Sequence, residues 1–286
     1  MRLLKIGKKI FDLDERTLIM GILNVTPDSF SDGGRFYSVD RAVEHAVQMV
    51  RDGADIIDIG GESTRPGSLS VSVDEEINRV APVLEELVDK VGAPISIDTY
   101  KSEVARMALD LGISMINDVT ALQGDKKMVN VVAEHDVPVC LMHMKGNPRD
   151  MQLDPRYDNV VEEIKGFLRE RAEYALFNDV KKENIIVDPG LGFGKRTGRG
   201  VEDNITILRN LSEFKELGYP VLVGASRKTF IGNVCGRDAQ LPVSDRLEGS
   251  LAAAVVAVIN GADIVRVHDV KETRRCINLV DSVVKS

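Results

Sequence analysis

Each of eight short apolar segments in the chain is followed by side chains that could hydrogen-bond a ligand. In chain order these polar residues are Asn24; Asp58 and Glu62; Asp98; Asn117; His143; Asp188; Ser226, Arg227 and Lys228; and Arg266 and His268. Carboxylates and asparagine carbonyls accept hydrogen bonds from ring N–H and amino groups, whereas a lysine donates to a ring carbonyl. Asp98, Asn117 and Asp188 supply such acceptors. Lys228 supplies the donor, and an arginine such as Arg266 can stack on a flat ring. The set predicts a pocket for a flat ring that carries donors beside an acceptor.

Taken singly, some of these residues have a simpler structural explanation. Asp98 could cap a helix that starts in the next few residues, and Asp188 could begin a turn. Helix capping does not explain Asn117, Lys228 or His268. In a parallel barrel the carboxyl ends of all strands converge on one mouth, where barrel enzymes keep their chemistry. We therefore expect these side chains to share one site.

The apolar segments alternate with helical patterns along the whole chain, which predicts an α/β protein. The expected strands cover residues 18–23, 56–60, 94–98, 114–117, 137–143, 184–188, 220–224 and 263–268. The expected helices cover residues 39–51, 73–91, 101–111, 126–134, 159–178, 203–217, 245–260 and 270–284. Eight such units at this chain length favour a closed (β/α)8 TIM barrel over an open sheet. A short N-terminal hairpin over residues 3–14 is expected before the barrel, and residues 1–286 are expected to form a single domain.

The composition argues against several classes of partner. The 286 residues carry 37 Lys and Arg against 45 Asp and Glu, a net charge of −8, so no basic surface for nucleic acid is expected. No apolar run approaches the length of a membrane span, and charged residues interrupt the N-terminus too early for a signal peptide. Cys140, Cys235 and Cys276 are scattered and odd in number. We expect a reduced, cytoplasmic protein without membrane or nucleic-acid partners.

Two loops rich in glycine, serine, threonine and proline follow the first two expected strands. The first lies in MGILNVTPDSFSDGG at residues 20–34, and the second in DIGGESTRPG at residues 58–67. The first segment resembles a signature of the dihydropteroate synthases, which join a dihydropterin to 4-aminobenzoate in folate biosynthesis. The resemblance covers essentially the whole chain, through SIDTYKSEVA (96–105), IND (116–118), LMHMKGNPRDMQ (141–152), DPGLGFGK (188–195), GASRKTFIG (224–232) and VRVHDV (265–270).

The resemblance implies a homodimeric transferase, the target of sulfonamides, that condenses (7,8-dihydropterin-6-yl)methyl diphosphate with 4-aminobenzoate. It implies that the pterin diphosphate is bound by Thr64, Asp98, Asn117, Asp188, Lys228, Arg266 and His268. It implies that 4-aminobenzoate is bound by Phe30, Thr64, Arg65, Pro66, Phe193, Lys228 and Thr229. It also implies Mg²⁺ as the cofactor, in contact with Asn24. As catalytic residues we expect Asp98, Asp188 and Lys228, with the two carboxylates stabilising positive charge that develops in the pterin.

The sequence departs from the family pattern at two places. Thr229 stands where the family usually has serine, and the segment that follows Gly194, KRTGRGVEDN, is longer than usual. The role of the extra loop over residues 195–200 stays open. The glycine-rich DPGLGFGK matches neither nucleotide fingerprint, since Pro189 occupies the position of the first Walker glycine and the glycines are spaced GxGxG.

Two other functions could use the same barrel. A pterin-binding methyltransferase acting on a methylated folate would share the aspartate and asparagine set but would not need the loops at 26–34 and 63–67. A non-catalytic pterin-binding protein would not need to keep Lys228, Arg266 or His268, and all three are present. Fold alone does not separate these functions, so the loops favour the synthase.

Overall fold

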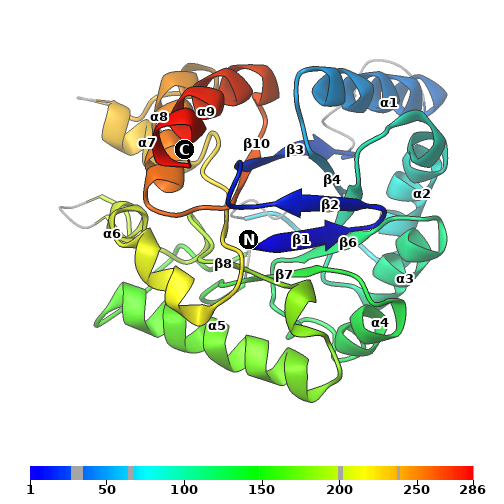
Figure 1. Ribbon diagram of the computed structural model, residues 1–286, viewed down its shortest axis with the longest axis horizontal. Helices are drawn as coiled ribbons and strands as arrows, with labels where there is room; N and C mark the ends of the chain where they lie inside the picture. Colours follow the sequence, from blue (N-terminus) through cyan, green and yellow to red (C-terminus); the bar gives the residue numbers. More distant parts are fainter. Residues whose placement is uncertain (27–34, 64–66, 148, 199–201, 237–238, 286) are drawn as a thin grey trace.

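The computed structural model describes residues 1–26, 35–63, 67–147, 149–198, 202–236 and 239–285, which form a (β/α)8 barrel preceded by a hairpin (Figure 1). The barrel strands are β3 (Leu18–Asn24), β4 (Ile56–Gly60), β5 (Ile95–Asp98), β6 (Met115–Asp118), β7 (Val139–Met142), β8 (Ile185–Asp188), β9 (Leu222–Val223) and β10 (Ile264–Val267). They pair in parallel in the order β8-β7-β6-β5-β4-β3-β10-β9. A parallel bridge between Val187 and Val221 joins the two ends of this sheet. The predicted TIM barrel is confirmed.

Helices surround the barrel (Figure 1). They are α1 (Arg35–Arg51), α2 (Val73–Lys90), α3 (Ser102–Asp110), α4 (Met128–His135), α5 (Val160–Phe177), α6 (Asp203–Arg209), α7 (Thr229–Cys235), α8 (Leu247–Ile259) and α9 (Val270–Val284). Their apolar sides share one large buried cluster with the strands. Strands β7 and β8 are therefore buried at every residue, which explains their nearly continuous apolar sequences, VCLM and IIVD. Within the described ranges, none of the helices has the length and apolar character needed to cross a bilayer.

The predicted hairpin closes one end of the barrel. Strands β1 (Leu3–Ile6) and β2 (Lys9–Asp12) pair antiparallel around a turn at Gly7, whose φ of 58° suits glycine. Side chains of the hairpin form a second buried cluster with residues near the starts of the strands: Leu4, Ile6, Phe11, Leu13, Leu18, Met20, Ile56, Met115, Cys140, Ile186, Leu222 and Ile264. Figure 1 shows the hairpin lying across this end, which we call the floor; the opposite end, at the carboxyl ends of the strands, is the mouth.

Buried carboxylates tie the floor together. Asp55 Oδ1 accepts a hydrogen bond from Arg16 at 2.6 Å. Its Oδ2 accepts from the Ile19 N–H at 2.8 Å and from Arg274. Other floor carboxylates act in the same way, and their donors are Arg2 and the Val221 N–H for Asp263, and Thr17 for Asp281. These contacts fasten segments that are far apart in sequence to the same end of the barrel.

The helices differ from the predicted pattern at three places. Helix α1 begins at Arg35, four residues before the expected start. The helix expected over 203–217 is interrupted at Asn210, whose φ of −106° and ψ of 23° are not helical and whose side chain donates to the Thr206 carbonyl at 2.9 Å. A 3-10 helix (Leu211–Leu217) follows. Helix α7 was not expected, and it has seven residues, no acidic residue in its first turn and no capping side chain at Lys228. It therefore carries none of the usual sequence signals of a helix start.

Candidate active site

A large cleft opens at the mouth of the barrel, with a volume of about 1460 Å³. Every predicted site residue that the structure describes lines it: Asn24, Asp98, Asn117, Asp188, Phe193, Lys228, Thr229, Arg266 and His268. The remaining predicted site residues, Phe30, Thr64, Arg65 and Pro66, lie outside the described residues. Typical small-ligand pockets measure roughly 300–1,000 Å³. The cleft therefore has room for two small substrates.

An arginine between two buried carboxylates lies in the cleft. Arg266 Nε donates to Asp58 Oδ2 at 2.6 Å, and Arg266 Nη2 donates to Asp98 Oδ2 at 2.7 Å. Asn117 Nδ2 donates to Asp58 Oδ2 at 3.0 Å. The other oxygens, Asp58 Oδ1 and Asp98 Oδ1, are buried without a hydrogen-bond partner among the described residues. Because Asp98 lines the cleft, a ligand N–H could satisfy its free oxygen.

This geometry gives a role to Asp58 and supports the prediction that Arg266 can stack on a flat ring. Asp58 was noted at a strand end, but no role was assigned to it; it orients Arg266 and Asn117 from beneath the cleft. No local signal could have revealed this, because its partners are 59 and 208 residues away. The hydrogen bonds of a guanidinium lie in its plane, so the two carboxylates leave the flat face of Arg266 available for stacking on a ring.

Burial shifts the titration of these groups toward neutral pH. It raises the pKa of Asp98 to about 7, although Arg266 opposes this effect. It also raises the pKa of Asp188 to about 6, against the opposing hydrogen bond from the Gly190 N–H. Burial lowers the pKa of Arg266, but Asp58 and Asp98 outweigh it, so the pKa is raised overall and the guanidinium stays charged. A ligand that donates hydrogen bonds to the carboxylates would favour their charged forms.

The segment after β8 forms one wall of the cleft. Asp188 Oδ1 accepts a hydrogen bond from the Gly190 N–H at 2.7 Å, so the carboxylate is held by its own loop. Further along this loop, the Phe193 ring lies 3.9 Å from the Lys228 ammonium, measured from the ring centroid. A cation over an aromatic face is an attractive arrangement. The contact joins the loop after β8 to the loop after β9.

A left-handed residue shapes the loop after β9. Arg227 has a φ of 58°, which is costly for a residue with a Cβ, and it is held by Asp269 and by the Ser250 hydroxyl. The neighbouring Ser226 also lines the cleft, and its hydroxyl lies 3.0 Å from His268 Nδ1. The turn thus presents a hydroxyl and a histidine to the same region of the cleft.

Asn24 is the described residue to which a metal role was assigned. It is the last residue of β3, opposite Gly60 of β4, and it lines the cleft. Among the described residues there is no group of three or more His, Cys, Asp or Glu side chains that could hold a metal ion. A divalent cation at Asn24 would therefore need further oxygen ligands from a substrate.

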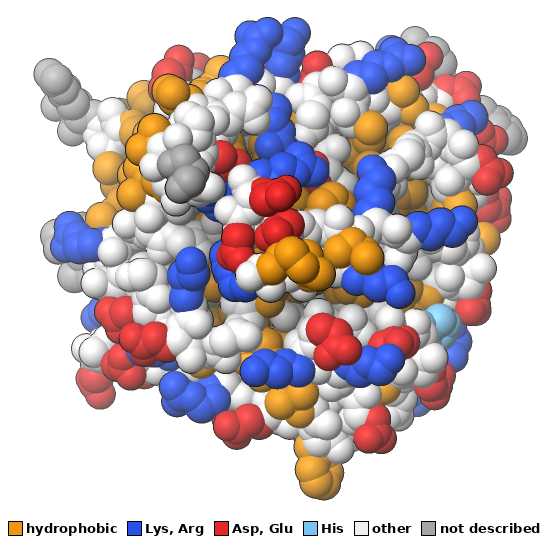
Figure 2. Space-filling model, in the orientation of Figure 1, with side chains coloured by type: hydrophobic (Ala, Val, Ile, Leu, Met, Phe, Trp, Pro, Cys, Tyr) orange, Lys and Arg blue, Asp and Glu red, His pale blue; other side chains and the backbone are white. Residues whose placement is uncertain are grey.

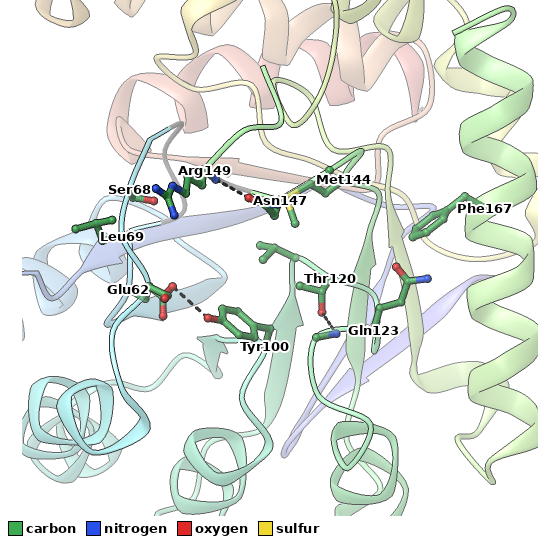
Figure 3. A pocket seen from close by; sticks show the side chains of 14 residues that line it. Glu62, Ser68, Leu69, Tyr100, Thr120, Gln123, Met144, Asn147, Arg149 and Phe167 are labelled. Atoms are coloured by element: carbon green, nitrogen blue, oxygen red, sulfur yellow. Dashed lines mark hydrogen bonds between the residues drawn. The ribbon is translucent and has the colours of Figure 1, made fainter. Parts of the chain in front are cut away.

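A smaller pocket of about 470 Å³ lies beside the cleft, between the loops that follow β4, β5, β6 and β7 (Figure 3). It shares four lining residues with the cleft: Glu62, Ser68, Leu69 and Val119. Figure 3 shows Tyr100 facing Glu62, to which its hydroxyl donates at 3.3 Å. The Lys101 ammonium pairs with Glu62 and with the buried Glu76. These contacts fasten Glu62, which follows β4, to α2 and to the start of α3.

Lys195 is the first residue of the extra loop over 195–200, and its burial was not predicted from the sequence. Its side chain is fully buried at the wall of the cleft. The ammonium contacts His143 and two backbone carbonyls. The next residues of this loop, Arg196–Gly198, also line the cleft. A lysine directly after a buried glycine-rich segment was the available signal.

Comparison with known proteins gives the family context of this site. A family model described as pterin binding enzyme matches residues 20–268. The dihydropteroate synthase of Clostridium beijerinckii is 47% identical over 283 residues, covering 99% of this chain and 100% of that protein. The dihydropteroate synthase of Bacillus subtilis is also 47% identical, covering 94% of this chain and 89% of that protein. The similarity therefore extends over almost the whole chain.

Solved structures agree with the sequence comparison. Dihydropteroate synthase of Xanthomonas albilineans with 4-aminobenzoic acid matches with a TM-score of 0.90 and 45% identity, covering 99% of this chain and 98% of that one. The same enzyme in complex with 7,8-dihydropteroate matches with a TM-score of 0.87 and 43% identity, covering 98% of each chain. A sulfonamide complex of the Yersinia pestis enzyme matches with a TM-score of 0.91 and 41% identity, covering 99% and 100%.

Proposed function

The chain belongs to the dihydropteroate synthases, and we propose that its barrel mouth performs the reaction of that family with the residues described above. The reaction condenses (7,8-dihydropterin-6-yl)methyl diphosphate with 4-aminobenzoate and releases 7,8-dihydropteroate and diphosphate. The observation that carries the residue assignment is the convergence of two buried carboxylates, an asparagine and a lysine in one cleft. The mixture suits a pterin ring, which presents N–H donors beside a carbonyl.

The decisive experiment incubates the purified protein with both substrates and Mg²⁺ and measures 7,8-dihydropteroate by mass spectrometry. Product is expected with the wild type and a strongly reduced amount with Lys228→Met. A pterin-binding methyltransferase would instead demethylate a methylated folate and give no dihydropteroate. Absence of product from folded protein under these conditions would refute the proposed residue assignment and the activity together.

In the proposed mechanism the pterin lies against Asp98, Asn117 and Asp188, which accept hydrogen bonds from its ring. Lys228 donates to the ring carbonyl. The bond between the pterin methylene carbon and the diphosphate oxygen breaks, and its electron pair leaves with the diphosphate. Asp98 and Asp188 stabilise the resulting cation electrostatically from a buried position, where such effects are strong. The amino nitrogen of 4-aminobenzoate then attacks the methylene carbon and loses a proton, so no covalent enzyme intermediate is needed.

The second substrate is assigned to the outer part of the cleft. The residues proposed to bind 4-aminobenzoate are Phe30, Thr64, Arg65, Pro66, Phe193, Lys228 and Thr229. The contact between Phe193 and Lys228 supports this assignment, because it brings an apolar ring and a cation together where an aromatic carboxylate would need both. A sulfonamide, which the Yersinia pestis enzyme holds in its complex, is expected to compete for the same place.

The diphosphate is assigned to Thr64, Arg266 and His268, and Asn24 would hold Mg²⁺. Mg²⁺ commonly takes one or two protein oxygens and completes its shell with substrate phosphates and water. A single carboxamide at the cleft fits that habit, and the cation would supply charge neutralisation for the leaving diphosphate. Turnover should collapse in excess EDTA and return with Mg²⁺. Full activity in the chelator would remove the metal role from Asn24.

A homodimer is proposed through α8 and α9, which pack side by side. Five apolar side chains of these helices are exposed: Val256, Ile259, Leu279, Val283 and Val284. Figure 2 shows hydrophobic side chains gathered at the upper left, over these helices and α7. An exposed apolar patch of this kind is typical of an interface, and a second copy of the chain is the occupant that the family implies.

The dimer proposal is tested by the molar mass in solution. Sedimentation of the wild type should give twice the chain mass, and the double variant Leu279→Asp, Val283→Asp should give the mass of one chain. The matched control is Phe177→Asp, which alters an apolar residue on α5 that is even more exposed. A monomeric wild type, or dissociation by the control alone, would contradict the assignment of this face.

A cytoplasmic location is also proposed. Its support is the state of the cysteines, since Cys140, Cys235 and Cys276 are all free thiols in the structure, and Cys140 is buried inside the barrel. Oxidising compartments favour paired cysteines. Cell fractionation with a cytoplasmic marker checks this proposal, and recovery in an oxidising compartment would contradict it.

A further inference from the structure

Lys195 presents an unusual arrangement for a lysine. Its side chain has no exposed surface, and two carbonyl oxygens and one imidazole nitrogen lie within hydrogen-bond distance of its Nζ. Nζ donates to the carbonyls of Gly190 and Phe193, each at 2.8 Å, and lies 3.1 Å from His143 Nδ1. A lysine ammonium has three N–H donors and no acceptor. With the His143 proton on Nε2, Nδ1 accepts, and the three neighbours then match the protonated lysine.

None of these three partners carries a negative charge, because two are backbone carbonyls and the third is an imidazole ring. Lys101, the other buried lysine near the mouth, is paired directly with Glu62 and Glu76. Burying a cation without a directly paired anion is costly, so its retention calls for a compensating role. Burial lowers the pKa of Lys195 to about 7, with Asp188 acting in the opposite direction.

The charged groups around Lys195 come from every neighbouring element. They are Asp188 at the end of β8 and Asp203 on α6, which raise its pKa, and Lys228 before α7 and Lys145 after β7, which lower it. The remaining neighbour, His143, is itself kept neutral, because burial, Lys195 and Lys145 all lower its pKa. Of these groups, the histidine alone contacts the ammonium through a side-chain atom in the described residues.

The ammonium is one of several groups that hold the glycine-rich loop. Tyr157 Oη donates to the Gly194 carbonyl at 2.6 Å, and Asn204 Oδ1 accepts from the Gly192 N–H at 2.7 Å. Gly190, Gly192 and Gly194 all have positive φ, and the backbone passes very close to the segment after β7. A Cβ on Gly190 would lie 1.9 Å from the His143 carbonyl oxygen, and one on Gly194 would lie 2.2 Å from that of Lys145. Glycine gives this loop its close approach at the cost of backbone freedom. Lys195 restrains it through two carbonyls.

We propose that Lys195 is a positioning residue of the active site: its ammonium holds residues 188–195 in the shape that presents Asp188 and Phe193 to the substrates, and it fixes the His143 ring with the proton on Nε2. Asp188 is linked to this loop through the Gly190 N–H, and Phe193 carries one of the two carbonyls that Lys195 binds. The lysine thus couples the pterin side of the cleft to the aminobenzoate side. The inference rests on the proposed function.

The first test uses the ligand-free wild type and is independent of activity. The chain has four histidines, and nitrogen-15 NMR of the labelled protein, with His143→Gln to assign its signals, reports the ring protonation. His143 should carry its proton on Nε2, accept at Nδ1 and stay neutral below pH 6. A ring protonated on Nδ1, or one that titrates at the ordinary histidine value, would overturn the proposal even if the enzyme makes dihydropteroate.

The second test compares Lys195→Met and Lys195→Arg with Lys165→Met. Lys165 is also largely buried, but it pairs with glutamates of α5 and of the 3-10 helix (Leu211–Leu217) away from the cleft, so its loss should affect stability alone. Lys195→Met should raise KM for both substrates about ten- to hundredfold, the usual effect of losing a charged hydrogen-bond donor. Lys195→Arg should retain the cation and move the alkaline fall of kcat/KM to higher pH. KM values and a pH profile that match those of Lys165→Met would overturn the positioning role.

Discussion

The floor and the mouth of the barrel both bury carboxylates, but the two that pair with Arg266 at the mouth are only partly satisfied. At the floor, both oxygens of Asp55 accept hydrogen bonds, and so do both oxygens of Asp263. At the mouth, Asp58 and Asp98 each keep one buried oxygen without a partner in the described part of the chain. The burial of Asp98 is also accompanied by a raised pKa.

The difference separates stability from binding. A buried oxygen without a partner costs about 1–3 kcal/mol, and a ligand that supplies the missing donor recovers that energy as affinity. The carboxylates of the floor therefore stabilise the folded protein. The carboxylates of the mouth keep acceptor oxygens without donors, which a substrate could supply. Substitutions at the two ends should affect different measurements.

The largest effect is expected at the floor. Asp55→Ala removes the partner of Arg274, which is 13% exposed, and should lower the free energy of unfolding by about 3–5 kcal/mol. Pterin affinity of the remaining folded protein should change little. Urea denaturation and calorimetry with a pterin analogue measure the two quantities. A variant that kept its stability but lost affinity would reverse the comparison.

At the mouth, Asp188→Asn should have the opposite profile. It replaces a charged acceptor while the ligand donors stay buried, so pterin binding should weaken by about 1.5–3 kcal/mol. The free energy of unfolding should be unchanged or higher, because burial disfavours the charged carboxylate in the folded protein. Calorimetry is the measurement, and an unchanged affinity would remove Asp188 from the site.

The pH dependence of the mouth follows from Asp98. Its pKa rises from 3.8 to about 7 on folding, so between these values the folded protein keeps a proton that the unfolded chain has lost. The free energy of unfolding should therefore fall as pH rises through this window and level off above it. Pterin affinity should rise in the same window, by at most about tenfold per pH unit for each group. Asp98→Asn should flatten both curves; identical curves in wild type and variant would exclude the assignment.

The smallest effect on stability is expected for Arg16, the most exposed partner of Asp55 at the floor. Arg16 is 47% exposed, and without it Asp55 still binds Arg274 and the Ile19 N–H. Arg16→Ala should thus cost about 0–1 kcal/mol of stability. Chemical denaturation measures the change, and the rate of dihydropteroate formation serves as the control. A loss as large as that of Asp55→Ala would mean that the network acts only as a unit.

Much of this arrangement could be predicted from the sequence, because the barrel follows from local patterns. Alternating apolar strands and amphipathic helices identify the TIM barrel, and its topology then brings the strand ends together. Asp98, Asn117 and Asp188 were found in this way. The assignment of residues 1–286 to a single domain stays a prediction, as do the roles given to the individual site residues.

What the sequence could not provide depends on contacts between distant segments. The pairing of Asp58 with Arg266 joins two strands 208 residues apart, and no local pattern encodes it. The burial of Lys195 was not foreseen, because lysines are usually exposed and the glycine-rich loop packs against the segment after β7, which is distant in sequence. Helix α7 was missed because it is short and lacks a capping side chain.

The closure between β8 and β9 has a consequence for motion. Strand β9 has only two residues, and it meets β8 through the bridge from Val187 to Val221, with the Val187 N–H donating to Pro220. Short ladders open more readily than long ones, so amide hydrogen exchange should be faster along this seam than along the pairing of β3 with β4. Asp188 lies just beyond one side of the seam and Lys228 beyond the other. A pterin that binds both residues would connect β8 and β9 where their pairing is shortest. Amide hydrogen exchange at this pairing should therefore slow when the pterin binds.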